Sequence, residues 1–294
     1  MPKPLLPLAR LDGQRAIVTG ANSGLGFETT LALSALGADV VLAVRNTAAG
    51  QDAADKIRAL HPEARLTVSF LDLADLASVS NFIFGEAGNP LDILVNNAGI
   101  MAPPFSRSVD GIESQMAANY VGHFALTAGL FPSLVQGTGG RVVSLSSVAH
   151  RRGKFETGSV DELRGTETNY SAWSRYGTTK LACLMFAFEL DRRAKKGGLP
   201  VVSVAAHPGW ASTNLQKGGN TRGNFLAQSA TTGARSQIIA AASHAVTGGE
   251  FVGPRLEIWG TPRVLRGIPL AYDETLAANL WRSAEKITGT TIAA

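Results

Sequence analysis

Cysteine is almost absent from this chain of 294 residues, which contains Cys183 alone. A single thiol excludes an internal disulfide and a cysteine-based zinc site. The sequence also contains neither a G-x-S-x-G nucleophile elbow nor an H-E-x-x-H zinc motif, so a hydrolase or a zinc protease finds no support. We therefore expect chemistry without a metal.

Charged residues are also scarce, at 17% of the chain, and the net charge is only +4. Two short basic runs, at residues 151–154 and 192–196, are typical of solvated surface. This charge pattern does not indicate a nucleic-acid partner.

Long apolar runs are missing as well, since none approaches the roughly 20 residues needed to cross a bilayer. Residues 1–10 contain three prolines and no apolar core of the signal-peptide kind. The sequence predicts a cytoplasmic protein without a membrane span.

Hydrophobic residues make up 45% of the chain and glycine occurs 32 times, which suits a sizeable core with many tight loops. Strand-like and helical segments alternate without a linker or an internal repeat. We predict one α/β domain over residues 1–294, a doubly wound parallel sheet of about seven strands with helices on both faces. The expected strands are residues 15–19, 39–44, 65–70, 91–95, 141–147, 201–206 and 256–259. One expected helix follows the first strand and ends near residue 36, and another begins near residue 76. The other expected helices cover residues 47–60, 111–131, 176–196, 233–244 and 272–287.

The first expected strand leads into a glycine-rich loop and then a helix. Glycines permit a tight turn and the close approach of a pyrophosphate, and a helix N-terminus presents free N–H groups. The spacing is G-x-x-x-G-x-G, and an ordinary glycine-rich turn is the alternative. The candidate cofactor contacts are Gly20, Asn22, Ser23, Gly24, Leu25 and Gly26.

The second expected strand ends in Arg45 and Asn46, about 20 residues beyond the glycine loop. An acidic residue here would hold the ribose 2′-hydroxyl of NAD, whereas an arginine accommodates a 2′-phosphate. The sequence therefore favours NADP over NAD. The alternative is an arginine that only faces solvent.

Further candidates follow later strands, at the sheet edge where ligands bind in such folds. Asp72, followed by Leu73, could accept from an adenine amino group or cap the next helix. Asn97, Ala98 and Gly99 could brace neighbouring strand ends and let a cofactor pass closely, although a plain turn has the same composition.

Two polar residues fall inside the helix expected over residues 111–131. Asparagine is disfavoured in a helix interior, so Asn119 is predicted to have a specific role. His123 is interpreted as a packed or surface histidine.

Tyr176 and Lys180 are one helical turn apart, so their side chains share one face of the helix. A phenol ordinarily keeps its proton up to a pH of about 10, and a nearby ammonium favours the phenolate. Such a pair can donate and accept a proton near neutral pH. The spacing is common, so a surface pair on an amphipathic helix is the alternative.

Two segments near these residues are polar and rich in glycine. Residues 150–175 are predicted to form a substrate-side insertion, and residues 210–232 a closing segment. A Pro–Gly turn after the sixth strand could bend the chain over a ligand. The cofactor contacts predicted there are Pro208, Gly209, Trp210 and Thr213.

Taken in order, these motifs resemble the classical short-chain dehydrogenase/reductase family from about Leu11 to at least Thr213. Residues 43–46 and 146–150 are most similar to the branch of retinol dehydrogenases, protochlorophyllide reductases and related bacterial oxidoreductases. Each motif is weak alone, and the ordered set is specific. The motifs are Thr19-Gly20-Ala21-Asn22-Ser23-Gly24-Leu25-Gly26, Asp72-Leu73, Asn96-Asn97-Ala98-Gly99, Asn119, Ser147, Tyr176 with Lys180, and His207-Pro208-Gly209.

The resemblance implies a Rossmann-like fold and hydride transfer between NADP(H) and a carbonyl or alcohol. Independently of it, the character of residues 151–175 and 210–232 suggests a medium-sized hydrophobic substrate. Tyr176 would be the general acid in reduction and the base in oxidation. Lys180 would favour the ionised phenol and hold the nicotinamide ribose. Ser147, rather than Ser146, would bind the substrate oxygen, and Asn119 would hold a water that leads protons to Lys180.

The segment between Ser147 and Tyr176 is longer than in compact members of the family. It would shape the substrate pocket and cover helix faces that many relatives use for assembly, so a monomer or homodimer is expected rather than a tetramer. Two alternatives stay open. One is a sugar-nucleotide epimerase or dehydratase, whose glycine loop usually reads G-x-x-G-x-x-G, and the other is a cofactor-binding sensor without catalysis.

Overall fold

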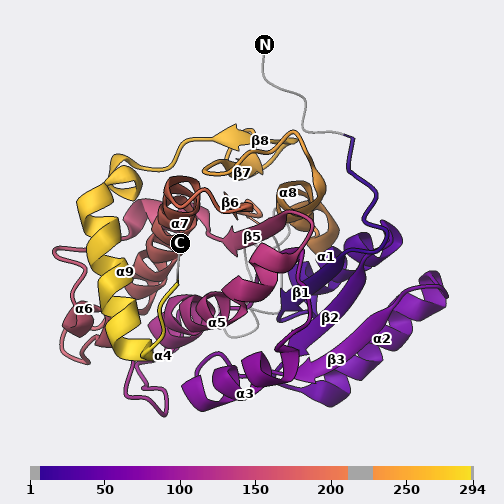
Figure 1. The fold of residues 1–294 in the computed structure, drawn as a ribbon. Helices are drawn as coiled ribbons and strands as arrows, with labels where there is room; N and C mark the ends of the chain where they lie inside the picture. Colours follow the sequence, from indigo (N-terminus) through magenta and orange to yellow (C-terminus); the bar gives the residue numbers. More distant parts are fainter. Residues whose placement is uncertain (1–6, 211–227, 293–294) are drawn as a thin grey trace.

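An eight-stranded sheet runs through the part of the chain that the computed structural model describes, residues 7–210 and 228–292 (Figure 1). The strand order is β3-β2-β1-β4-β5-β6-β7-β8, and all neighbours are parallel except β7 and β8. The predicted parallel sheet is confirmed, with eight strands where about seven were expected. The strands are β1 (Arg15–Thr19), β2 (Asp39–Val44), β3 (Leu66–Phe70), β4 (Ile93–Asn96), β5 (Gly140–Leu145), β6 (Val201–Ala206), β7 (Phe251–Pro254) and β8 (Pro262–Leu265).

Helices cover both faces of this sheet, as predicted (Figure 1). The α-helices are α1 (Gly24–Ala35), α2 (Thr47–Leu60), α3 (Leu76–Glu86), α4 (Ser114–Met116), α5 (Gly122–Gln136), α6 (Val160–Arg164), α7 (Ala172–Lys196), α8 (Ala230–Ala242) and α9 (Glu274–Thr288). The other helical turns are η1 (Ala117–Val121), η2 (Val148–Arg152) and η5 (Pro269–Tyr272). Among the described residues, no helix combines the length and the apolar character that crossing a membrane requires.

Two hydrophobic cores lie on opposite sides of the sheet, because successive strand residues point to opposite faces. In β1, Ile17 joins the core under α3, α5 and α7, whereas Ala16 and Val18 join the core under α1, α2 and α8. All three side chains are fully buried. Strands buried on both faces consist of continuous apolar runs, which made most of them recognisable in the sequence.

The last helix, α9, lies across α5 and α7 and closes the first core (Figure 1). Trp281 is buried, stacks on Phe186 with ring centroids 5.8 Å apart, and meets Phe124 edge-on at 5.2 Å. The guanidinium of Arg193 lies 4.3 Å from the centre of the Trp281 ring. One large aromatic side chain therefore ties the C-terminal helix to the two central helices.

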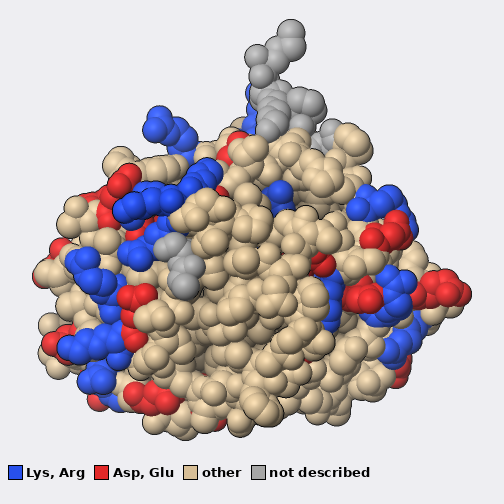
Figure 2. Space-filling model, viewed as in Figure 1, with Lys and Arg blue, Asp and Glu red and all other residues tan. Residues whose placement is uncertain are grey.

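The basic run at residues 192–196 belongs to a set of local ion pairs at the end of α7. Arg192 and Arg193 pair with Glu189, and Lys195 pairs with Asp191. Figure 2 shows Lys and Arg mixed with Asp and Glu along the margins of one face, with a broad area of few charges between them. On this face the cations do not gather into one continuous patch.

The helix expected over residues 111–131 is not a single α-helix. It begins at Ser114 as α4, passes through the π-helical turn η1 and continues as α5 to Gln136. The Glu113 side chain caps its start by accepting from two backbone N–H groups of the first turn. Asn119 lies within the π turn. Such a turn is rare and has no sequence signature of its own, so it was not anticipated from the sequence.

The prediction of a strand at residues 256–259 is wrong, because these residues form the turn between β7 and β8. The Leu256 N–H bonds the Trp259 carbonyl at 3.0 Å, and Glu257 has a φ of 64° in the left-handed region. Leu256 is 68% exposed, so its apolar character reflects a surface turn and not a buried strand. The real last strands flank this turn.

A buried threonine joins the loops that follow β1 and β4, the point where the strand order reverses. Thr19 Oγ1 accepts from the N–H groups of Asn97 and Ala98, each at 2.9 Å. His123 Nδ1 donates to the Asn119 carbonyl at 3.0 Å, so His123 Nε2 can accept from the Thr19 hydroxyl at 2.9 Å. His123 is therefore a packed histidine, one of the two interpretations of the sequence.

Burial lowers the pKa of His123 to about 4, and the nearby charge of Lys180 acts in the same direction. The bond to the Asn119 carbonyl opposes these two effects. A second N–H on the ring would point at the Thr19 oxygen, which already accepts two hydrogen bonds. His123 is thus held neutral at physiological pH.

We expect His123 to make the fold less stable in mild acid. A histidine in the unfolded chain takes up a proton below a pH near 6.5, whereas His123 in the folded protein stays unprotonated until the pH falls to about 4. The free energy of unfolding should fall across this range as the pH is lowered, by up to about 1.4 kcal/mol per pH unit from this residue. Urea unfolding at a series of pH values should show a flatter profile for His123→Gln.

The matched control is His61→Gln, which replaces an exposed histidine at the end of α2. It should keep the wild-type profile. Identical pH profiles for His123→Gln and the wild type would contradict this account of the buried ring.

Candidate active site

Tyr176 and Lys180 lie on the buried side of α7, against the end of β5. Tyr176 is 7% exposed and Lys180 is 5% exposed. Lys180 Nζ lies 5.7 Å from the centre of the Tyr176 ring and donates to the Leu145 carbonyl at 3.1 Å. Among the described residues, no side chain or backbone group bonds the Tyr176 hydroxyl. The alternative of a surface pair on an amphipathic helix is therefore wrong.

The two serines after β5 have different partners. Ser146 is buried and donates its hydroxyl to the Lys180 backbone carbonyl at 2.8 Å. Ser147 begins η2, where its Oγ accepts from the Ala149 N–H at 3.2 Å. The proton of Ser146 is therefore used within the fold, whereas that of Ser147 is available to a ligand. This geometry favours Ser147, the serine that the family resemblance also selects.

Asn119 connects the loop after β4 to α7. Its Oδ1 accepts from the Ile100 N–H at 2.8 Å, and its Nδ2 donates to the Ile100 carbonyl and to the Thr179 hydroxyl, both at 3.0 Å. The Asn119 backbone carbonyl accepts from His123 and from Cys183 Sγ, the latter at 3.1 Å. The sequence predicted a specific role for Asn119, and in the structure its side chain joins the loop after β4 to α7. Its role in holding a water stays a prediction.

Gly99 brings the backbone after β4 against these side chains. A Cβ on Gly99 would lie 2.9 Å from Asn119 Oδ1 and 3.5 Å from Lys180 Nζ. These three residues thus converge at the carboxyl edge of the sheet, the edge at which Ser147 also follows its strand. Ligands of doubly wound sheets bind at this edge, next to the point where the strand order reverses.

The glycine loop lies between β1 and α1, as predicted. A Cβ on Gly26 would collide with the Gly20 carbonyl and lie 2.6 Å from Asn97 Nδ2. Ser23 precedes α1 without making a side-chain cap bond, and the first turn contains no acidic residue. The first N–H groups of α1 are therefore free of a side-chain acceptor, which fits a phosphate group. The residues of this cradle are Gly20, Asn22, Ser23, Gly24, Leu25 and Gly26.

Asn97 braces the strand ends as the sequence suggested. Its Nδ2 donates to the Thr19 carbonyl at 2.6 Å, and its Oδ1 accepts from Gln237 of α8 at 3.3 Å. Ala98 packs close to the loop, since a Cβ on Gly20 would lie 3.1 Å from its Cα. These contacts exclude the plain-turn alternative for Asn97 and Ala98.

Arg45 and Asn46 follow β2 at the same edge of the sheet. Arg45 is exposed and, in the part of the chain that the structure describes, forms no hydrogen bond or ion pair. Asn46 caps α2, because its Oδ1 accepts from the Ala49 N–H at 3.0 Å. The Arg45 guanidinium thus remains available to an anion, whereas the Asn46 oxygen is already engaged.

Asp72 does not cap the helix after it, which was one of the two roles expected. The cap of α3 is Asp75, whose side chain accepts from two N–H groups of the first turn. A cap directly precedes its helix, and Asp72 lies three residues too early. Its carboxylate accepts instead from the Ala74 N–H at 2.9 Å. The contact with an adenine amino group stays a prediction, as does the role of the buried Leu73.

The turn after β6 packs against the turn between β7 and β8. Gly209 has a φ of 74°, and a Cβ there would collide with the Ile258 carbonyl. The Trp210 N–H donates to this carbonyl at 3.1 Å, and Pro208 is half-buried beside them. Thr213 and most of the predicted closing segment lie outside the described residues.

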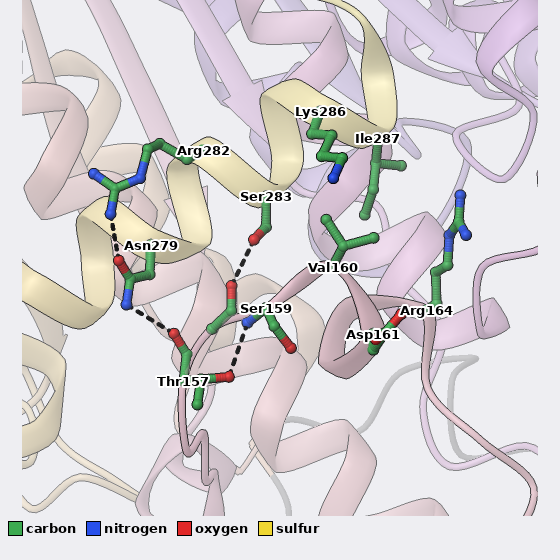
Figure 3. A pocket seen from close by; sticks show the side chains of 11 residues that line it. Thr157, Ser159, Val160, Asp161, Arg164, Asn279, Arg282, Ser283, Lys286 and Ile287 are labelled. Carbon is green, nitrogen blue, oxygen red and sulfur yellow. Dashed lines mark hydrogen bonds between the residues drawn. The ribbon is translucent and has the colours of Figure 1, made fainter.

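The predicted insertion at residues 150–175 is partly ordered into η2 and α6 and docks on α9. Asn279 donates to the Thr157 carbonyl at 2.9 Å, and Ser283 donates to the Gly158 carbonyl at 2.7 Å (Figure 3). A pocket of about 650 Å³ lies between these segments (Figure 3). None of the predicted catalytic or cofactor residues lines it. This pocket is therefore separate from the candidate active site.

Two side chains at the site were not anticipated. Thr179 lies between Tyr176 and Lys180 and bonds Asn119, but a threonine in a helix gives no signal by itself. Gln237 is buried and also donates to the Leu25 carbonyl at 3.2 Å. A glutamine followed by the apolar residues 238–242 is the signal that could have revealed it.

Comparison with known proteins identifies the family of this chain. Residues 14–159 match the family model described as short chain dehydrogenase. A crystal structure of a protein from Mycobacterium paratuberculosis superimposes with a TM-score of 0.85, at 37% identity and with 100% of both chains covered. The match therefore extends over the insertion and the C-terminal helix as well as the glycine loop.

Retinol dehydrogenase 12 of Mus musculus is 38% identical over 219 residues, which cover 74% of this chain and 66% of that protein. The chain spans 64 to 66% of the length of this protein and of two short-chain dehydrogenases of Brassica napus, TIC 32 A and TIC 32 B. Polyprenol dehydrogenase of Mus musculus is 35% identical over 302 residues, which cover 97% of this chain and 86% of that protein. The chain belongs to the short-chain dehydrogenase/reductase family of oxidoreductases and is similar to the retinol dehydrogenases within it.

Proposed function

We propose that this protein transfers a hydride between NADP(H) and a carbonyl or alcohol group, with Tyr176 as general acid and base. The observation that carries the proposal is the buried Lys180 ammonium, 5.7 Å from the centre of a tyrosine ring whose hydroxyl has no partner among the described residues. Burial of an ammonium is unfavourable unless it is compensated, so a buried lysine beside this tyrosine suggests a role beyond packing.

The chain's own side chains can handle the proton. Reduction of a carbonyl builds negative charge on its oxygen, and donors fixed near that oxygen stabilise the transition state. Ser147 has a hydroxyl proton to donate, and Tyr176 can transfer its own proton to the same oxygen. The Lys180 ammonium stabilises the phenolate that remains, and in the reverse direction this phenolate accepts the alcohol proton. When bound, NADP(H) supplies or accepts the hydride.

The cofactor assignment rests on Arg45 and the phosphate cradle. A free guanidinium at the end of β2 suits a 2′-phosphate, and the uncapped N-terminus of α1 suits the pyrophosphate. Lys180 would hold the nicotinamide ribose. Asp72, Leu73 and the residues that follow β4 and β6 would line the rest of the path, as the family resemblance implies.

A medium-sized apolar substrate is the proposal that the surroundings of Tyr176 support. Trp173 is 58% exposed one turn before Tyr176, and the two rings meet edge-on with centroids 6.2 Å apart. Ile100 and Met101, which follow Gly99, are half-buried. An apolar molecule next to Tyr176 could cover this surface and release water from it.

We further propose a monomer or homodimer, because α9 covers the outer sides of α5 and α7. The cytoplasmic location and the lack of a nucleic-acid partner stay predictions from composition.

A preference for NADPH is expected, and it should depend on Arg45. Oxidation of NADPH and NADH is followed with a panel of aldehydes, ketones and quinones. Arg45→Ala should lower kcat/KM for NADPH about 10- to 100-fold, as expected for the loss of a charged hydrogen-bond donor, and leave NADH nearly unchanged. The control is Lys56→Ala, which removes an exposed cation from α2. A wild-type preference for NADH would refute this cofactor assignment.

Tyr176→Phe is expected to lower turnover by at least about 100-fold, because it removes the proton donor and keeps the ring. Binding of NADPH, measured by fluorescence titration, should change little. Tyr272→Phe is the control, since Tyr272 stacks on Phe188 at the far end of α7. Full activity of Tyr176→Phe would remove the central role of this tyrosine. The epimerase and sensor alternatives predict no net oxidation of either cofactor by the wild type.

A further inference from the structure

A carboxylate that is completely buried lies at the start of α4, next to the candidate active site. Glu113 is 0% exposed. Its oxygens accept from Arg175 Nε at 2.7 Å and from the Tyr170 hydroxyl at 3.0 Å, in addition to the two N–H groups that it caps. Such a buried charge is tolerated only when it is fully paired. The proposed mechanism makes no use of it.

Arg175 precedes Tyr176 directly and spreads its guanidinium over two segments. Besides the bond to Glu113, its Nη1 donates to the Glu162 carbonyl at 2.8 Å and its Nη2 to the Leu163 carbonyl at 2.7 Å. Arg175 therefore joins the start of α7 to α4 and to α6. The residues just before α6 are fixed on α9, because Asn279 and Ser283 donate to the carbonyls of Thr157 and Gly158 (Figure 3).

Gln115 and Tyr170 extend this network to the loop after β4. Gln115 Nε2 donates to the Tyr170 hydroxyl at 2.7 Å and to the Ala172 carbonyl at 3.0 Å. Its Oε1 accepts from the N–H of Ala102, which has a φ of 51° in the left-handed region. A left-handed alanine is unfavourable unless its surroundings hold it. The Gln115 amide supplies that restraint.

Gln115 and Asn119 are one helical turn apart, and both side chains form hydrogen bonds with the loop after β4 and with α7. On one side they bond Ala102 and Ile100, in the loop after β4. On the other side they bond Ala172 and Thr179, which lie before and after Tyr176 on α7. The spacing between the loop and Tyr176 is therefore set by side chains of α4 and η1.

Burial raises the pKa of Tyr170 to about 12, and the Glu113 charge adds to this effect. The Tyr170 hydroxyl is thus a permanent donor. Tyr170 therefore stays protonated and uncharged throughout the neutral pH range.

We propose that Glu113, Gln115, Tyr170 and Arg175 are positioning residues that fix residues 100–105 relative to Tyr176 and so determine which carbonyl substrates are accepted. The inference rests on the proposed function. Residues 100–103 are half-buried and follow Gly99, which lies against Lys180 and Asn119. A substrate oxygen that reaches Tyr176 and Ser147 must place the rest of the molecule beside this loop.

The test compares Arg175→Lys and Tyr170→Phe with matched controls. Lysine keeps the charge of Arg175 and loses the fork that reaches α6. The first control is Arg193→Lys, which changes a second arginine of α7 whose Nε donates to a buried glutamate, Glu189, at 2.6 Å. The second control is Tyr272→Phe, which removes a hydroxyl that accepts from the Gly267 N–H at 3.0 Å.

For each variant, kcat and KM are measured with the smallest and the largest carbonyl compound that the wild type reduces. Arg175→Lys and Tyr170→Phe should change the ratio of the two kcat/KM values at least fivefold, while the Kd of NADPH stays within twofold. The two controls should keep the wild-type ratio. A purely structural role would lower the melting temperature in Arg175→Lys and Arg193→Lys alike and leave both ratios unchanged, which would overturn the proposal.

A second readout does not require activity. Hydrogen exchange of the peptide that contains residues 100–105 should accelerate in Arg175→Lys and Tyr170→Phe and remain unchanged in the controls. Unchanged exchange in both variants would overturn the positioning role, even if the wild type reduced many carbonyls. If the wild type reduced none, the proposed function would fail, and exchange would still decide whether the network holds this loop.

Discussion

The geometry of the candidate site depends most on the hydrogen bonds of the Asn119 side chain. Its amide holds the backbone of Ile100 on one side and the Thr179 hydroxyl on the other, so it sets the distance between the loop after β4 and α7. Because the amide is buried, each of these polar groups would be costly to leave unpaired. The end of β1, which leads into the glycine loop, is linked to the same point, since Thr19 bonds His123 and His123 bonds the Asn119 carbonyl.

This arrangement brings a positive charge and a neutral imidazole into one buried region. Lys180 is held by the Leu145 carbonyl, and burial keeps the nearby His123 uncharged. A second cation there would compete with Lys180 for the few acceptors available. Among the described residues, the Lys180 ammonium is thus the cation beside Tyr176, and the proposed proton transfer depends on this neighbour because an ammonium favours a phenolate.

Short-range patterns could be predicted from the sequence, and long-range pairings could not. The bounds of β1, β2, α2 and β6 were predicted to the residue, because strands buried on both faces and a helix between clear caps leave strong signals. Tyr176, Lys180 and Ser147 were found through their order along the chain. The bond between Glu113 and Arg175 joins residues 62 positions apart. The π turn at Asn119 is a rare insertion that no local sequence signature marks. The turn at residues 256–259 was mistaken for a strand because its exposed apolar residues imitate a buried one.

The claim that this site transfers a hydride is tested most directly by the fate of a deuterium label. NADPH carrying deuterium at C4 of the nicotinamide, in either of its two stereochemical forms, is incubated with the protein and a carbonyl compound that it reduces. The account predicts that one form transfers deuterium to the carbonyl carbon of the product and that the other form does not, because a fixed site presents one face of the cofactor. A product alcohol without deuterium from either form, observed by mass spectrometry, would contradict it.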